Sequence, residues 1–212
     1  MAQPALDGER PRVMSAPVDV ARPDDMVTEF TDYSQRLQKV LAQADLSGVA
    51  ALGRAMRDCW RDDRSIYLCG NGGSAGNAVH LANDLLYGIA KNNGVGMRAH
   101  ALPANTSILT CLANDLDYSE IYAAQLKVYA RRGDLLLALS GSGNSPNILR
   151  AIETAKSLGM STFAVLGYGG GKAKSMVDVA IHFPVDDMQI SEDLQLVVGH
   201  MIMQSLYRSR ST

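Results

Sequence analysis

Short apolar segments alternate with segments of helical periodicity along most of this 212-residue chain. A short continuous apolar run, rather than a strict apolar–polar alternation, is typical of a strand buried on both faces of a parallel sheet. Five such segments occur, at residues 65–69, 97–102, 135–139, 161–166 and 179–183. Strands that alternate with helices predict an α/β fold, a doubly wound parallel sheet with helices on both faces.

A long helix from Ser191 to Leu206 is predicted to close the chain, and two further helices are predicted before the first strand. One begins at Pro23, with Asp24 and Asp25 at its positive end, and the other is expected to be capped by Ser47. Residues 1–23 are rich in proline and lack periodicity, so we expect a disordered arm there. Residues 24–212 are expected to form a single domain that includes both helices, although this helical pair could instead face another subunit.

Composition excludes several classes of protein. A net charge of −2 and a pI near 6.1 give no basic field for nucleic acid. No apolar run reaches the roughly 20 residues of a membrane helix, and no signal-peptide pattern begins the chain, so we expect a cytoplasmic protein without a membrane partner. The cysteines Cys59, Cys69 and Cys111 are odd in number and lack CxxC spacing, which argues against disulfides and a multi-cysteine metal site. Cys69 and Cys111 are expected to be buried.

Two loops carry the strongest functional signal. The Gly-rich loop, residues 69–74 (Cys-Gly-Asn-Gly-Gly-Ser), and the Ser-rich loop, residues 140–145 (Ser-Gly-Ser-Gly-Asn-Ser), each join a predicted strand to a predicted helix. Free backbone N–H groups and the helix dipole favour an anion at such a junction. Neither loop has the nucleotide P-loop or dinucleotide pattern. One such loop is an ordinary turn about as often as a site, but two in one domain predict a binding site for a phosphorylated sugar.

The two loops, with His80 six residues after the first, resemble the two signatures of the SIS (sugar isomerase) domain family. From about Met26 to about Tyr207 the chain is most similar to the sedoheptulose 7-phosphate isomerases, also called phosphoheptose isomerases. The resemblance implies a homotetramer with active sites at subunit interfaces and one Zn²⁺ per site. It also implies interconversion of sedoheptulose 7-phosphate and D-glycero-D-manno-heptose 7-phosphate. The implied substrate-binding residues are Asn71, Gly72, Gly73, Ser74, Asn114, Asp115, Ser140, Gly141, Ser142, Ser145 and Glu192.

The resemblance further implies a base at Asp84, an acid at His200, and a metal site formed by His80, Asp84, Glu192 and His200. This chain departs from the family there, with Asp84 in place of Glu and Glu192 in place of Gln. It also has Gly141 in place of Thr, and Leu86-Tyr87-Gly88 where the family has Arg and Tyr after its catalytic Glu. His80 and Asp84, four residues apart, share one helix face. Glu192 and His200 are separated by roughly 12 Å of straight helix, so one ion reaches both easily only if Glu192 lies on an irregular segment before the helix or the two residues serve different chains.

These observations leave three functions open. The leading hypothesis is isomerisation of sedoheptulose 7-phosphate in heptose biosynthesis. Because the departures concentrate in the catalytic half of the site, the second hypothesis is a non-catalytic SIS protein that binds a partner. The third is an isomerase of a pentose or hexose phosphate. Taken alone, His80 would more often be a hydrogen-bonded helix histidine, and Asp84 a solvated surface charge.

Overall fold

A computed structural model describes residues 23–91 and 94–209. The predicted arm therefore lies outside the described residues, except for Pro23. The chain divides into two compact units, residues 1–39 and 40–212. Most of helix α1 (Pro23–Gln43) belongs to the first unit, and its apolar side chains Val27 and Phe30 are exposed. No described helix combines the length and the apolar character needed to span a bilayer.

The second unit contains the predicted parallel sheet. Its strands are β1 (Ser65–Cys69), β2 (Arg98–Ala101), β3 (Leu135–Ser140), β4 (Ser161–Leu166) and β5 (Val179–His182). All pairs are parallel, and the spatial order is β2-β1-β3-β4-β5. The chain therefore moves outward from β1 to β2 and then returns to β3 on the other side of β1. A crevice at such a switch point, outside the carboxyl ends of the strands, is where ligands bind in open α/β sheets.

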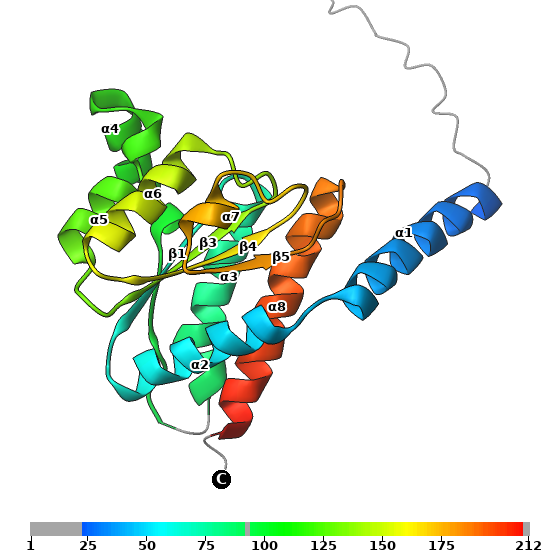
Figure 1. The fold of residues 1–212 in the computed structure, drawn as a ribbon, viewed down its shortest axis with the longest axis horizontal. Coiled ribbons are helices and arrows are strands. Elements are labelled where there is room, and N and C mark those ends of the chain that lie inside the picture. The colour runs from blue at the N-terminus through cyan, green and yellow to red at the C-terminus, as the bar shows by residue number, and fades with distance from the viewer. Residues whose placement is uncertain (1–22, 92–93, 210–212) are drawn as a thin grey trace, which may run out of the picture. The chain divides into compact units, whose positions relative to one another are not determined.

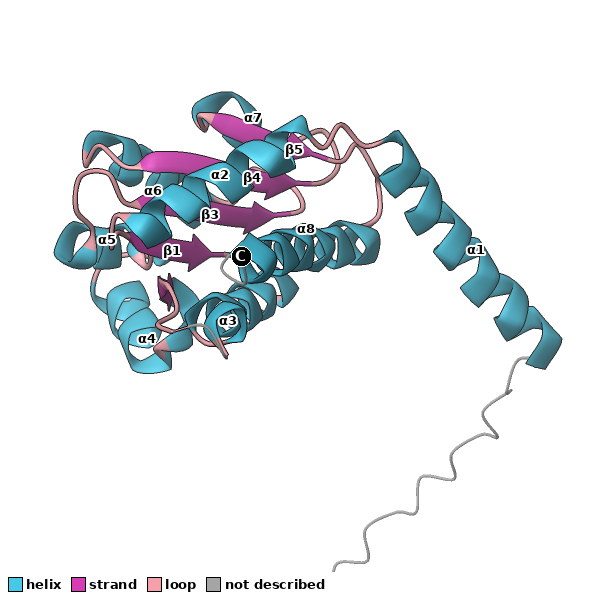
Figure 2. Ribbon diagram, turned by 90° about the horizontal axis from the view of Figure 1, so that it is seen from below, coloured by secondary structure: helices cyan, strands magenta, loops and turns pink. Residues whose placement is uncertain are grey.

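Helices cover both faces of this sheet, as predicted (Figures 1 and 2). One face packs against α2 (Ser47–Arg61), α3 (Gly73–Leu86) and α8 (Met188–Ser209), and the other against α5 (Ala123–Tyr129), α6 (Pro146–Ser157) and α7 (Ala173–Met176). The remaining elements are α4 (Thr106–Asp115) and the 3-10 turns η1 (Gly88–Ala90), η2 (Leu102–Ala104) and η3 (Tyr118–Glu120). Strands β1 and β3 are buried along their whole length, which explains why their sequences are apolar except for Ser65 and Ser140 at their ends.

Three local predictions were wrong. Ser47 is the first residue of α2 rather than its cap, and its N–H and hydroxyl both donate to the carboxylate of Asp45. Cys111 is exposed, because α4 has no buried residue at all. Helix α8 begins at Met188, three residues earlier than predicted, with its first turn before Ser191. By contrast, Cys69 is buried as predicted, and this burial raises the pKa of its thiol to about 12.

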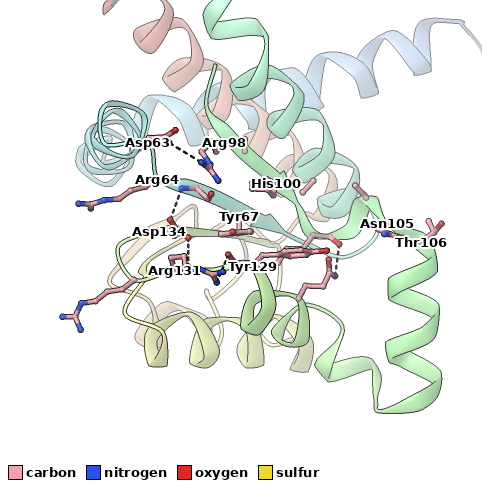
Figure 3. Close-up of a pocket in the computed structure, with 17 residues that line it drawn as sticks. Asp63, Arg64, Tyr67, Arg98, His100, Asn105, Thr106, Tyr129, Arg131 and Asp134 are labelled. Carbon is pink, nitrogen blue, oxygen red and sulfur yellow. Dashed lines mark hydrogen bonds and ion pairs between the residues drawn. The ribbon is translucent and has the colours of Figure 1, made fainter. Parts of the chain in front are cut away.

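Strand β2 forms one edge of the sheet, and a cavity runs along it that shares no lining residue with the two loops (Figure 3). The opposite edge is β5. The Gly-rich loop follows β1 and the Ser-rich loop follows β3, so both lie at the carboxyl ends of the two strands that flank the switch point.

Candidate functional site

The two loops line one cavity of about 270 Å³. Its wall consists of Asn71, Gly72, Gly73, Ser74, Leu139, Ser140, Gly141, Ser142, Ser145, Met188 and Glu192. The cavity therefore brings together all of the substrate-binding residues predicted from the sequence, except Asn114 and Asp115. Those two lie in the last turn of α4, where the amide of Asn114 donates to the carboxylate of Asp115 at 2.8 Å.

Hydrogen bonds within the Ser-rich loop stabilise its conformation. The hydroxyl of Ser140 accepts from the Gly143 N–H at 3.1 Å, and the hydroxyl of Ser142 accepts from the Asn144 N–H at 3.3 Å. Gly143 has a positive φ of 65°, and a Cβ there would lie 2.1 Å from the carbonyl oxygen of Gly170. Ser145 precedes α6 without making a side-chain cap. Because Pro146 has no N–H and the Ile148 N–H is bonded to Asn147 Oδ1, the first turn of this helix offers an anion the Asn147 N–H.

The Gly-rich loop already faces a carboxylate. A Cβ on Gly73 would lie 2.2 Å from Oε2 and 2.5 Å from Oε1 of Glu192, so only glycine permits this approach. Gly73 is the first residue of α3, and a negative charge beside a helix N-terminus is stabilised by the helix dipole. Because Glu192 supplies that charge at the Gly-rich loop, the Ser-rich loop is the better place for a phosphate.

Gly141 is explained by a similar contact with Met188. A Cβ on Gly141 would lie 2.7 Å from the Met188 sulfur atom. The thioether occupies the space that a threonine side chain would need at this position. Met188 lines the same cavity. Where the family has threonine, this chain therefore has Gly141 together with an apolar side chain in the cavity wall.

A hydrogen-bonded pair of amides joins the two loops. Asn71 Nδ2 donates to Asn147 Oδ1 at 2.9 Å, and Asn147 Nδ2 donates to Asn71 Oδ1 at 2.7 Å. Asn147 is fully buried in the first turn of α6, where its Oδ1 also accepts from the Ile148 N–H. Its contact with Asn71 therefore fixes the Gly-rich loop relative to the helix that follows the Ser-rich loop.

Two tyrosines complete this network and orient the Asn71 amide. The hydroxyls of Tyr118 and Tyr122 each lie 3.4 Å from Asn71 Oδ1, and Tyr122 also donates to the Gly70 carbonyl. With Oδ1 surrounded by donors, Asn71 presents its remaining Nδ2 hydrogen, which has no acceptor among the described residues. Asn71 can therefore donate a hydrogen bond to a ligand oxygen.

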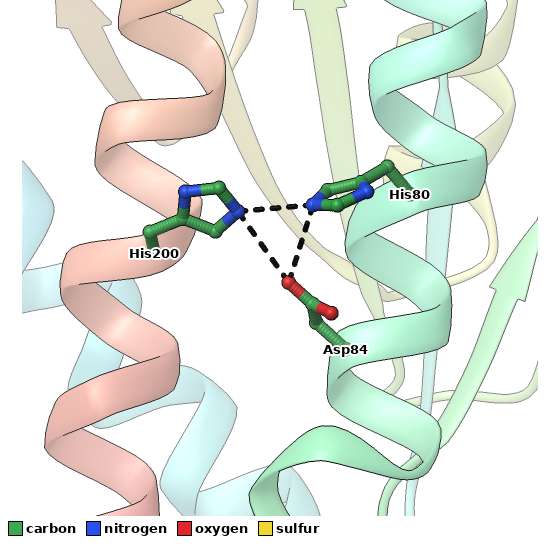
Figure 4. Close-up of side chains that lie close together, drawn as sticks. All are labelled: His80, Asp84 and His200. Carbon is green, nitrogen blue, oxygen red and sulfur yellow. Dashed lines mark hydrogen bonds and ion pairs between the residues drawn. The ribbon is translucent and has the colours of Figure 1, made fainter.

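A second cluster lies between α3 and α8 (Figure 4). His80 and Asp84 project from α3 and His200 from α8. The two histidine Nε2 atoms lie 3.0 Å apart, and Asp84 Oδ2 lies 3.4 Å from Nε2 of His80 and 3.5 Å from Nε2 of His200. The side chains of His80 and His200 are 49% and 42% exposed, whereas that of Asp84 is 16% exposed.

The spacing of these atoms fits a metal ion. Zinc with nitrogen and oxygen ligands at about 2.0–2.1 Å holds adjacent ligand atoms of a tetrahedron about 3.3 Å apart. The three distances in the cluster bracket this value, and all three atoms come from side chains that zinc prefers. Three protein ligands leave a fourth position for water or substrate, which is typical of a catalytic rather than a structural site.

Glu192 does not join this group, although the sequence predicted it as a fourth metal ligand. Glu192 and His200 both lie within α8, and their separation of eight positions corresponds to roughly 12 Å along the helix axis. The Glu192 carboxylate instead faces Gly73 in the loop cavity. Within this chain Glu192 therefore lines the loop cavity, and the group that could hold a metal ion is His80, Asp84 and His200.

Sequence reasoning did not identify Asn147, Tyr122 or Met188. Asn147 immediately follows the Ser-rich loop and Pro146, so the sequence shows that it lies beside this loop. The sequence does not show that it pairs with Asn71, which is 76 residues away. Tyr122 lies in a segment that was predicted only as helical, and Met188 lies before the predicted start of the last helix.

Comparison with known proteins agrees with this geometry. Residues 29–167 match the family model described as "SIS domain". A phosphoheptose isomerase of Chlorobaculum parvum is 38% identical over 185 residues, covering 86% of this chain and 88% of that protein. A phosphoheptose isomerase of Helicobacter pylori strain P12 is 40% identical over 186 residues, covering 87% and 96%. The solved phosphoheptose isomerase of Francisella tularensis superposes with a TM-score of 0.82 at 26% identity, covering 88% of this chain and 99% of that one.

Proposed function

Since the chain belongs to the SIS-domain family and, within it, to the phosphoheptose isomerases, we propose that it interconverts sedoheptulose 7-phosphate and D-glycero-D-manno-heptose 7-phosphate. The reaction would serve heptose biosynthesis. The observation that carries this assignment is the presence, in one chain, of a two-loop cavity suited to a sugar phosphate and a His–Asp–His cluster suited to proton transfer and metal binding. The family assignment also makes the protein an isomerase rather than a non-catalytic SIS protein.

The loop cavity would hold the phosphate and the polyhydroxyl chain. We assign the phosphate to the Ser-rich loop, where Ser142 and Ser145 line the cavity beside the first turn of α6. The Nδ2 hydrogen of Asn71 is available for a sugar oxygen. Glu192 can accept from a sugar hydroxyl in the same cavity. Asn114 and Asp115 stay predicted contacts, since a role for them requires a substrate that extends beyond this cavity.

Proton transfer is assigned to Asp84 and His200. In the ketose-to-aldose direction a base takes a proton from C1, and the electron pair forms the C1–C2 double bond while the O2 carbonyl oxygen is protonated. The resulting enediol then loses the O1 proton and regains a proton at C2, which yields the aldose. Asp84 is assigned to carbon and His200 to oxygen, because a carboxylate and an imidazole can exchange protons near neutral pH.

The metal is proposed to be Zn²⁺, held by His80, Asp84 and His200. When bound, such an ion polarises substrate oxygens and steadies negative charge on the enediol. The chain's own part is to hold the three side chains at this spacing, with His80 and Asp84 fixed one helical turn apart on α3.

We also propose a homotetramer in which another subunit covers the cluster. Both histidines are more than two-fifths exposed. On the same two helices the apolar side chains Val79, Leu86 and Met201 are exposed as well. Exposed apolar side chains beside a partly exposed His–Asp–His cluster favour a contact with another subunit over exposure to solvent. A cytoplasmic location stays a prediction from the sequence.

The direct test is turnover. The protein is incubated with sedoheptulose 7-phosphate and Zn²⁺, and ¹H NMR follows the anomeric signals of the aldose. Growth of these signals, and their absence with His200→Ala, is the expected result. A folded, zinc-loaded protein that produces no aldose would overturn the assignment, and turnover of a pentose or hexose phosphate alone would replace it with the other sugar.

A further inference from the structure

A larger cavity, of about 1120 Å³, lies along the edge strand β2 (Figure 3). It is bordered by the residues that begin β1 and β2 and by the turn before β3, whereas the two loops follow the carboxyl ends of β1 and β3. No described residue lines both cavities. The proposed isomerase reaction makes no use of this second cavity.

Positive charge is in excess around it. Its charged lining residues are Arg64, Arg98, Arg131 and Arg132 against Asp63 and Asp134. The Asp134 carboxylate is buried and already accepts from the backbone N–H groups of Ser65 and Arg131, at 2.9 and 2.7 Å. Arg98 pairs with Asp63 at 3.3 Å, but the Asp63 side chain is 82% exposed, so solvent screens this pair strongly.

Arg131 carries an uncompensated charge. Its Nη1 donates to the backbone carbonyls of Val128, Tyr129 and Ala130, at 3.2, 3.4 and 3.0 Å. These bonds hold the guanidinium at the end of α5, and no carboxylate of a described residue pairs with it. Because one nitrogen makes all three bonds, the other donors of the guanidinium are free for a ligand.

Flat rings occupy the middle of the cavity. Tyr67 and His100 stack with centroids 5.2 Å apart and an interplanar angle of 21°. Burial lowers the pKa of His100, and neighbouring Arg98 lowers it further, so this imidazole is neutral at pH 7. The exposed Tyr129 stands opposite, at the end of α5 (Figure 3). Neutral rings beside arginines form a surface on which a planar group can stack.

The far end of the cavity is the start of α4. Figure 3 shows Asn105 and Thr106 on the opposite side of the rings from Arg98 and Arg131. The Asn105 side chain accepts from the Ile108 N–H and so caps this helix. The cavity therefore has arginines at one end, aromatic rings in the middle and hydrogen-bonding groups at the other end.

We propose that this cavity binds a nucleoside phosphate, with its phosphates between Arg98 and Arg131 and its base stacked between His100 and Tyr129. Inorganic phosphate would use only the arginines, and a free nucleoside only the rings. Arginine pairs well with phosphate because its planar guanidinium can donate two parallel hydrogen bonds. The volume exceeds the range of roughly 300–1,000 Å³ usual for small-molecule sites, so it leaves room for a diphosphate.

The test is calorimetric titration of the full chain with ADP, with adenosine and with inorganic phosphate. ADP is expected to bind at least about tenfold more tightly than either fragment, since each lacks one set of contacts. Arg98→Ala and Arg131→Gln are each expected to weaken ADP binding by about tenfold or more. Arg57→Ala, which removes an exposed arginine of α2, is the matched control and should change nothing.

Saturating sedoheptulose 7-phosphate should leave ADP binding unchanged, and turnover of the arginine variants should equal that of the unmodified protein. The proposal is overturned if ADP does not bind, if the sugar phosphate displaces it, or if both arginine variants bind it as well as the unmodified protein. Equal binding of ADP and inorganic phosphate would also overturn it, because the rings would then contribute nothing. These outcomes do not depend on whether the isomerase assignment is correct.

Discussion

The loop cavity and the His–Asp–His cluster are built in opposite ways. The loop cavity is held by contacts within one chain, and its glycines allow close approaches by Gly170, Glu192 and Met188. The cluster consists of three side chains on two helices, with both histidines partly exposed. Backbone geometry therefore shapes the proposed phosphosugar site, whereas the proposed chemistry depends on three side chains. Departures from the family occur in both regions, because Gly141 and Glu192 line the loop cavity and Asp84 belongs to the cluster.

The substitution His200→Ala is expected to have the largest effect, because it should remove catalysis and leave the loop cavity intact. The variant loses an acid and a metal ligand, so kcat should fall by about 10³-fold or more, and zinc content should fall with it. Binding of sedoheptulose 7-phosphate should weaken only a few-fold, because the loops are untouched. Turnover, metal analysis and calorimetric titration check the three parts. Loss of sugar binding in a folded variant would contradict the separation.

Breaking the Asn71–Asn147 amide pair should impair substrate binding in the loop cavity and leave the His–Asp–His cluster intact. Asn147→Leu leaves the Asn71 amide without its partner, so we expect kcat/KM to fall by roughly 10- to 100-fold while zinc content stays the same. Asn144→Ala is a control in the adjacent loop, where the Asn144 side chain bonds only to the Ser142 carbonyl and the Lys172 N–H. It should cost less than Asn147→Leu. An Asn147 variant with normal kinetics would show that the pair is not needed for positioning.

The substitution Ser142→Ala tests the proposed position of the phosphate, and its effect on kinetics should be smaller than that of Asn147→Leu. Removal of one hydroxyl from the Ser-rich loop should raise KM by about tenfold and leave kcat nearly unchanged. Ser107→Ala, at an exposed position of α4, is the matched control. If KM stays constant while kcat falls, the phosphate does not lie at Ser142.

The smallest effect is expected from Glu192→Gln, which restores the residue type of the family. If Glu192 only contacts substrate, kcat should change by no more than a few-fold and zinc content should not change. Asp84→Asn is the comparison, and it should lower both zinc content and kcat strongly. A larger loss of kcat in the Glu192 variant than in the Asp84 variant would assign the carbon-side base to Glu192.

The sequence predicted the sheet well because β1 and β3 are continuous apolar runs apart from one terminal serine each, a pattern that indicates burial on both faces. The same reasoning failed for Cys111. Helix α4 packs beside the layers rather than against a face of the sheet, so an apolar sequence there does not imply burial.

The candidate site was predictable only where local spacing determines geometry. The i, i+4 spacing placed His80 and Asp84 together, and the helix rise warned that Glu192 and His200 would be far apart. The contact of His200 with His80 depends on how α3 packs against α8. The Asn71–Asn147 pair depends on the pairing of β1 with β3, which places the two loops side by side. Such contacts arise from the tertiary fold, which residue spacing does not encode.

The most direct test of the central claim is titration of metal-free protein with sedoheptulose 7-phosphate, followed by a turnover assay before and after addition of Zn²⁺. Our account predicts that metal-free protein binds the sugar phosphate within a few-fold of the zinc-loaded affinity but does not isomerise it, and that Zn²⁺ restores turnover. Binding that appears only with Zn²⁺, or full turnover in its rigorous absence, would contradict the division between a phosphate-binding cavity and a metal-dependent cluster.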